Sequence, residues 1–197
     1  MEIVKWRTDA VMKTLVLVRT KNHYLDNAVV AEFCLLQLRL CCELLAIGCI
    51  AVHKDVPQSK RLHKMWNADA IMQKFHELKP RFFPHPVRSE KQPDDKWVQQ
   101  NVQGALTKSE LLKMYHFFGG LLHSGTFEKY ASRQRQTYDF KLIEEFLGKL
   151  LKLLNEHVYY LNDGEVMVRV IMSNADQGGR VSWNVLEKMS NDSAVRQ

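Results

Sequence analysis

The sequence lacks the short motifs by which many enzymes are identified from sequence alone. It contains no glycine-rich phosphate loop, no H-E-x-x-H zinc motif and no G-x-S-x-G nucleophile motif. None of its four cysteines belongs to a C-x-x-C pair, which excludes a zinc knuckle. Catalysis by these routes is therefore not expected.

Targeting and membrane signals are missing as well. The N-terminal segment MEIVKWRTDAVMK has no apolar signal-peptide region, and the longest uninterrupted apolar run, Leu44–Val52, is far short of the roughly 20 residues that span a bilayer. All four cysteines lie in one apolar helical stretch, at spacings that do not allow them to bridge. Buried reduced thiols, no membrane contact and a cytoplasmic location are expected.

The composition is that of a globular chain. With 46% hydrophobic and 25% charged residues, its 197 residues are enough to bury a core and suit one domain. We expect a single domain over residues 1–188, with a disordered polar tail at 189–197.

Apolar periodicity predicts a helical fold. The expected helices cover residues 3–19, 27–52, 59–78, 107–123 and 139–158. Thr107 and Glu110 form a capping-box pattern at the start of the fourth. Residues 80–104 hold four of the five prolines and are expected to form an ordered loop. Alternating apolar residues predict a hairpin within about 157–187. The predicted fold class is mainly α, a bundle of about five helices with a C-terminal β-hairpin.

Positive charge is concentrated in one third of the chain. Residues 60–91 hold eight Lys and Arg against three acidic residues, so this segment carries five of the six net positive charges. Such a concentration favours a polyanionic partner, although a solvated basic face is the alternative. Interleaved aromatics add the possibility of base stacking. The candidate nucleic-acid-binding residues are Lys60, Arg61, Lys64, Lys79, Arg81, Phe82, Phe83, His85 and Arg88.

Two further groups of residues are candidates for chemistry. Arg39 and Glu43 lie four residues apart on an otherwise apolar helix, so they are either a structural ion pair or part of a polar site. His116 and His123 lie two helical turns apart, on either side of Gly119-Gly120. Glycines inside a helix suit a place where another group must approach closely. The histidines are candidate acid–base groups or, alternatively, core and capping residues.

The strings LRLCCELLAIGCIAVHKDV and YHFFGGLLHSG resemble the two core helices of HEPN-type domains, over residues 27–160. These helical bundles occur in prokaryotic toxins and abortive-infection proteins. In that family an acidic residue faces an R-x4-6-H motif, and the pair cleaves RNA without metal in a dimer. The resemblance implies Glu43 as the acidic residue and His123 as the motif histidine. The motif arginine is absent, so His116 or Arg39 would hold the phosphate.

The resemblance implies RNA as a partner, a homodimer, and no metal or cofactor. The first hypothesis is accordingly an RNA-engaging protein of a prokaryotic or phage conflict system, as a weak or degenerate ribonuclease that needs no metal. A non-catalytic homodimeric adaptor is the alternative. A small-molecule-binding bundle with a cavity lined by the cysteines is the third.

Overall fold

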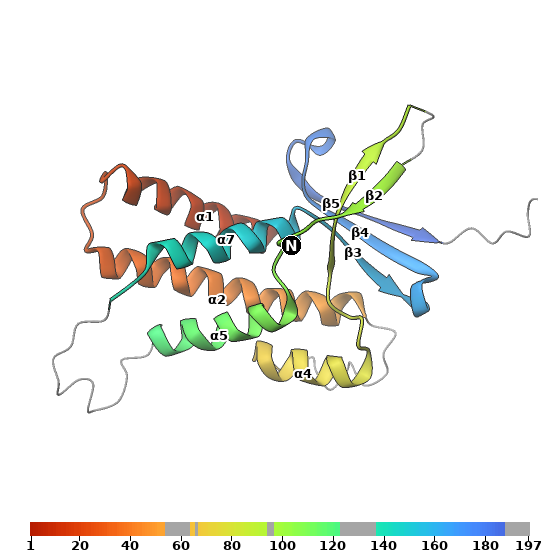
Figure 1. Ribbon diagram of the computed structural model, residues 1–197, viewed down its shortest axis with the longest axis horizontal. Helices are drawn as coiled ribbons and strands as arrows, with labels where there is room; N and C mark the ends of the chain where they lie inside the picture. Colours follow the sequence, from red (N-terminus) through yellow and green to blue (C-terminus); the bar gives the residue numbers. More distant parts are fainter. Residues whose placement is uncertain (54–63, 66, 94–96, 123–136, 188–197) are drawn as a thin grey trace, which may run out of the picture.

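The structure is a computed structural model that describes residues 1–53, 64–65, 67–93, 97–122 and 137–187. In these ranges the chain forms five helices and one antiparallel sheet of five strands, placed at one end of the helical layer (Figure 1). The helices are α1 Glu2–Arg19, α2 Asn27–Val52, α4 Ala68–Leu78, α5 Lys108–Leu122 and α7 Phe140–Leu154. The strands are β1 His85–Lys91, β2 Trp97–Asn101, β3 Glu156–Leu161, β4 Val166–Asn174 and β5 Arg180–Glu187, in the order β2-β1-β3-β4-β5.

Side chains at the starts of α2 and α5 cap these helices. Asp26 caps α2 by accepting a hydrogen bond from the Ala28 amide at 2.7 Å. The predicted capping box of α5 is confirmed: the Glu110 carboxylate accepts from the Thr107 amide at 3.0 Å, and the Glu110 amide donates to the Thr107 hydroxyl at 3.2 Å. These side chains satisfy amides that a helix leaves without an internal partner.

The long apolar helix α2 is the centre of the helical layer. It packs against α1, α4, α5 and α7. Its inward face contains all four cysteines, each fully buried and unbridged, as the sequence predicted. Burial raises the pKa of the Cys34 thiol to about 11 and that of Cys41 to about 12. These thiols are therefore core packing groups rather than nucleophiles.

The predicted fold class, a helical bundle with a single hairpin, is wrong. The predicted hairpin is present as β4 and β5, but it is part of a sheet that also includes β1, β2 and β3. The fold is therefore mixed, with helices and an antiparallel sheet, and all its strands follow residue 84. The segment 80–104, expected to be a loop, contains β1 and β2.

Two local features explain why β1 and β3 were not predicted from the sequence. Pro86 lies within β1, where proline is disfavoured because it has no N–H to donate, yet it pairs with His157 of β3. The second feature is the boundary between α7 and β3. Val158 continues the apolar spacing of α7, which led to a helix predicted through residue 158, but α7 ends at Leu154 and β3 begins at Glu156.

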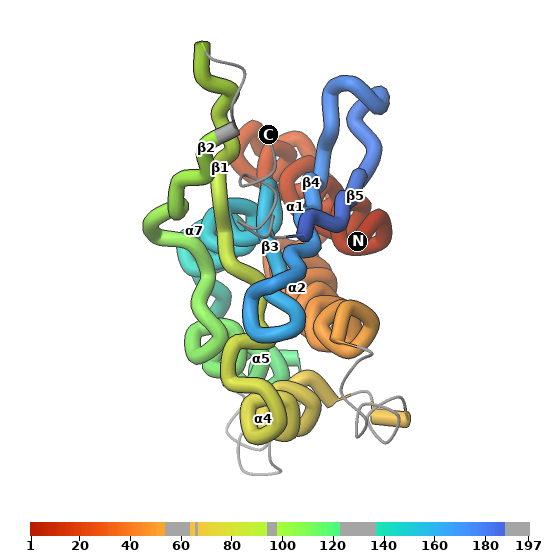
Figure 2. Tube along the Cα trace, turned by 90° about the vertical axis from the view of Figure 1, so that its right-hand side faces the viewer, coloured from red at the N-terminus to blue at the C-terminus, as the bar shows by residue number. Residues whose placement is uncertain are grey.

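The sheet and the helices share one core. Strand β3 lies in the middle of the sheet, and three consecutive residues, His157, Val158 and Tyr159, are buried. Figure 2 shows the sheet crossing the end of the helical layer, next to the C-terminal half of α2. There the ring of His53, which follows α2, packs edge-on against Tyr159, with 6.0 Å between ring centroids. Burial of these side chains joins the two layers into one body.

Candidate functional site

The predicted Arg39–Glu43 pair is present on α2. Arg39 Nε lies 3.7 Å from Glu43 Oε1, and the two side chains are 20% and 19% exposed. Both therefore reach solvent at one end while their stems are buried. We refer to Arg39, Glu43 and the residues they meet on α5 as the polar cluster.

Arg39 reaches across from α2 to α5. Its Nη1 donates to the Tyr115 carbonyl at 3.0 Å, and its Nη2 donates to the Tyr115 hydroxyl at 3.1 Å. The guanidinium carbon lies 4.1 Å from the centre of the Tyr115 ring, which adds a cation–π contact. Each terminal nitrogen of a guanidinium carries a second N–H. For those two groups the described residues supply no acceptor.

Tyr115 closes the cluster. Its hydroxyl accepts from Arg39 and donates to Glu43 Oε1 at 3.2 Å. Burial, followed by the negative charge of Glu43, raises the pKa of Tyr115. The phenol therefore stays protonated at neutral pH and keeps donating to Glu43, which holds that carboxylate beside Arg39.

Gly119 makes room for the guanidinium. A Cβ on Gly119 would stand 2.2 Å from Arg39 Nη1, whereas a Cβ on Gly120 would meet nothing within 4 Å. The sequence predicted a close approach at this glycine pair, and the approaching group is the Arg39 side chain. Only the first of the two glycines is required by it.

Of the two candidate histidines, only His116 belongs to the described residues. His116 lies beside the cluster, its ring 5.7 Å from that of Tyr115, but its Nε2 pairs with Asp69 of α4 at 3.4 Å and its side chain is 60% exposed. It contacts Tyr115 and not Arg39 or Glu43 in the described interactions. His123 lies outside the described residues, four positions after Gly119 in the sequence.

The predicted nucleic-acid-binding residues that the structure describes near α4 lie at both ends of this helix. Lys60 and Arg61 lie outside the described residues. Lys64 is exposed and precedes α4, while Lys79 and Arg81 follow its other end. Asp69 and His116 are at the first end, so the positive charges are divided between the two ends of α4.

Phe82 is not available as a stacking platform. It is fully buried, with its ring 5.3 Å from Phe75. Its carbonyl lies 3.0 Å from Nε2 of the buried His53. Phe83 is half-buried and His85 is exposed, with the His85 ring packed against Tyr160 at 5.2 Å. Only these two of the three aromatic candidates reach the surface.

Tyr115 was not among the predicted site residues, although it hydrogen-bonds to both Arg39 and Glu43. Its spacing of four from Gly119 places both on one face of α5, and this spacing was the available signal. No group of three or more His, Cys, Asp or Glu suited to a metal ion occurs among the residues that the structure describes.

Comparison with known proteins adds no family assignment. No family model, no curated protein and no solved structure matches this chain.

Proposed function

We propose that the chain engages RNA, with Arg39 of the polar cluster as the group that binds a phosphate. The observation that carries this proposal is the pair of guanidinium N–H groups that find no acceptor among the described residues, on an arginine that is held in place and partly exposed. A planar guanidinium binds phosphate oxygens through two parallel hydrogen bonds. Arg39 on α2 thus takes the place of the HEPN motif arginine, which those domains carry on the same helix as the motif histidine.

The other members of the cluster orient this cation. The Glu43 carboxylate and the Tyr115 carbonyl and hydroxyl each face a different nitrogen of the guanidinium, so its direction is set before a phosphate arrives. Glu43 also offsets part of its charge, which weakens binding relative to a free arginine. We therefore propose weak RNA cleavage without metal, in which Arg39 stabilises charge on the phosphate and His123, by resemblance to HEPN domains, transfers the proton.

The test is an RNA-binding and cleavage assay with EDTA present, on labelled single-stranded and hairpin RNA. Removing the charge-assisted hydrogen bonds of Arg39 is worth about 1.5–3 kcal/mol, so Arg39→Ala is expected to weaken binding by roughly 10- to 100-fold. Arg39→Lys keeps the charge without the planar fork and should recover only part of the affinity. Lys13→Ala, on the exposed side of α1, is the control for simple loss of positive charge.

Two readouts separate binding from chemistry. Cleavage that survives EDTA and is lost in His123→Ala would support a metal-independent ribonuclease, and binding without cleavage would leave RNA engagement alone. RNA affinity that is equal in Arg39→Ala and Lys13→Ala would contradict the proposal. Thermal unfolding of each variant shows whether the fold is retained.

A second candidate, the non-catalytic homodimer, is favoured by a separate observation. Helix α2 is long and apolar enough to cross a bilayer by length and composition, yet only half of its most apolar 18-residue stretch is buried inside the protein. Helix α1 packs along α2, and both helices have exposed apolar residues. We define the outer face by its exposed apolar residues, Ile3, Trp6, Leu17, Val29, Phe33, Leu36 and Ile47.

A second copy of the chain is the proposed occupant of the outer face. Trp6 is 64% and Phe33 is 41% exposed, and exposed large apolar residues on two neighbouring helices are typical of protein interfaces. We expect the wild-type chain to sediment as a dimer and Phe33→Asp to sediment as a monomer, because a charge would be buried without a partner. Val98→Asp, on the distant β1–β2 hairpin, should remain dimeric. A monomeric wild-type chain would rule the homodimer out.

A further inference from the structure

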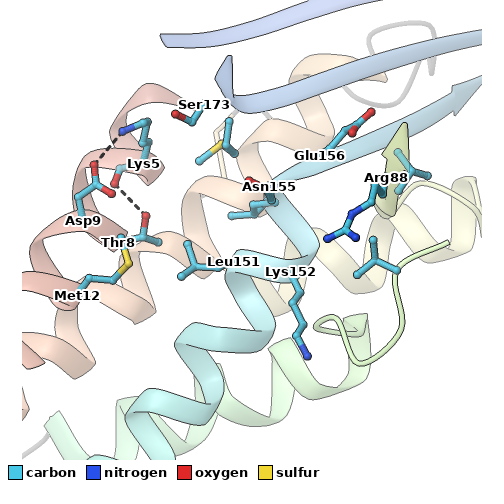
Figure 3. Close-up of a pocket in the computed structure, with 14 residues that line it drawn as sticks. Lys5, Thr8, Asp9, Met12, Arg88, Leu151, Lys152, Asn155, Glu156 and Ser173 are labelled. Carbon is cyan, nitrogen blue, oxygen red and sulfur yellow. Dashed lines mark hydrogen bonds and ion pairs between the residues drawn. The ribbon is translucent and has the colours of Figure 1, made fainter. Parts of the chain in front are cut away.

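A pocket that the polar cluster does not use lies between the helices and the sheet. It has a volume of about 450 Å³ and is formed by α1, the C-terminal end of α7, β1 and β4 (Figure 3). This volume is within the usual range for small-molecule sites, roughly 300–1,000 Å³. None of the cysteines lines it, so it differs from the cavity that the sequence analysis considered.

The lining combines an apolar part with a few polar side chains. The apolar part comes from all four elements and from the segment after β2, and its residues are Met12, Val87, Val102, Leu151, Leu154 and Met172. Such a surface suits the carbon skeleton or the ring of a ligand.

Most of the charged groups at the pocket already have partners. Lys5 Nζ lies 3.0 Å from Asp9 Oδ2 on α1, so these two charges offset each other. Glu156 accepts hydrogen bonds from the Ser89 amide at 3.0 Å and from Arg169 Nε at 2.7 Å. Burial raises the pKa of Glu156, but these donors outweigh burial and hold the pKa below its usual value. Its negative charge is therefore compensated within the protein.

Two positive side chains remain. Arg88 of β1 and Lys152 of α7 line the same pocket, and no carboxylate in the described part of the chain pairs with either of them. Both are exposed. Figure 3 shows them on one side of the pocket, with Thr8 and Asp9 of α1 on the opposite side. The pocket therefore has an excess of positive charge at one end, next to an apolar lining.

We propose that this pocket binds a small organic anion, of about the size of a nucleoside monophosphate, that has an apolar or ring-shaped body. Arg88 and Lys152 bind the phosphate or carboxylate group, because a guanidinium and an ammonium pair with either. The apolar lining contacts the body of the ligand. Thr8 and Asp9, on the opposite side of the pocket, form hydrogen bonds with the far end of the ligand. Arg88, a candidate for nucleic-acid binding by sequence, thus belongs to a small-molecule site.

The test is isothermal titration calorimetry of the full chain with adenosine 5′-monophosphate and with 4-phenylbutyrate, which present a phosphate and a carboxylate on a ring-bearing body. Adenosine, which lacks the anionic group, is the uncharged comparison. We expect at least one of the two anions to bind and adenosine to bind at least tenfold more weakly than the monophosphate. Whichever anion binds identifies the preferred head group.

Variants tie the binding to this pocket. The double variant Arg88→Ala/Lys152→Ala should lower the affinity for the anion at least tenfold, and Asn155→Trp should abolish binding by filling the pocket. Lys141→Ala, on the same helix as Lys152 and outside the pocket, should bind normally. Failure of both anions to bind, or equal binding by all the variants, would overturn the proposal. Arg39→Ala should leave this binding unchanged, so the outcome is independent of the RNA proposal.

Discussion

Gly119→Ala is expected to abolish most RNA binding, whereas Gly120→Ala should leave it unchanged. The two glycines are adjacent on α5, but a Cβ on Gly119 would lie 2.2 Å from Arg39 Nη1, while a Cβ on Gly120 would meet no atom within 4 Å. The guanidinium is the far end of a flexible side chain, so it moves out of its place and the backbone stays. The fold is retained, and the phosphate-binding group is lost.

The stabilities of the two variants should change in opposite directions. Alanine is favoured over glycine inside a helix by about 1 kcal/mol, so Gly120→Ala should raise the free energy of unfolding by about that amount. Gly119→Ala gains the same helix stabilisation but loses the hydrogen bonds from Arg39 to Tyr115. As bonds from a charged group, these are worth about 1.5–3 kcal/mol each. With two such bonds lost and about 1 kcal/mol gained, we expect a net loss of about 2–5 kcal/mol.

Urea unfolding and RNA titration on the same preparations check both expectations. A Gly119→Ala protein that binds RNA as tightly as Gly120→Ala would show that the position of the guanidinium is irrelevant to binding. The polar cluster would then be a structural link between α2 and α5. This is the other interpretation of Arg39 and Glu43 that the sequence allowed, a structural ion pair.

Acid is expected to destabilise the fold through His157 of β3. This side chain is fully buried, and its Nδ1 lies 3.1 Å from the Leu154 carbonyl, to which it donates when neutral. Burial lowers the pKa of His157 to about 4. In the unfolded chain a histidine has a pKa of about 6.5. The unfolded state therefore takes up a proton first as the pH falls.

The sign and size of the effect follow from this difference. Stability is complete above about pH 6.5, falls progressively below it and levels off near pH 4, since only the unfolded state is protonated within that window. A difference of about 2.5 pKa units corresponds to about 3 kcal/mol of unfolding free energy. The wild-type chain should lose that amount through His157 between pH 7 and pH 4.

The measurement is urea unfolding across this pH range for wild type and His157→Asn, whose amide can still donate to Leu154 but does not titrate. Carboxylates titrate in both proteins, so the difference between the two curves isolates the histidine. His76→Asn, on the exposed side of α4, is the control. Parallel pH curves for wild type and His157→Asn would show that the buried ring is not the acid-sensitive group.

Most helices were predictable because their signals are local. The apolar spacing and the Asp26 cap of α2, and the Thr107–Glu110 box of α5, act within a few residues of the chain, and both helices are where the sequence placed them. The third expected helix, predicted over residues 59–78, does not run unbroken: residues 64, 65 and 67 are not helical, and α4 begins at Ala68, after an Asn67 cap. Residues 59–63 of this prediction lie outside the described residues.

The sheet was less predictable because strands depend on partners far away in the sequence. Strand β1 contains a proline and a run of polar residues, and it is stabilised by pairing with β2 and by the hydrogen bonds of Ser89 to Glu156, 67 residues later. Nothing within residues 80–104 indicates this partner. Likewise, Phe82 looks like a surface aromatic between basic residues until Phe75 and His53 are brought against it.

The sequence by itself determined the helical stretches, the buried thiols and the Arg39–Glu43 pair, because each depends on spacing along a single helix. Only the tertiary structure decided what that pair meets: Tyr115 and Gly119 lie more than 70 residues away from Arg39, and the packing of α2 on α5 brings them together. The pocket between α1, α7 and the sheet depends on tertiary structure in the same way. Its positive charge arises because Arg88 and Lys152 both line it, while Lys5 and Glu156 are paired with oppositely charged side chains.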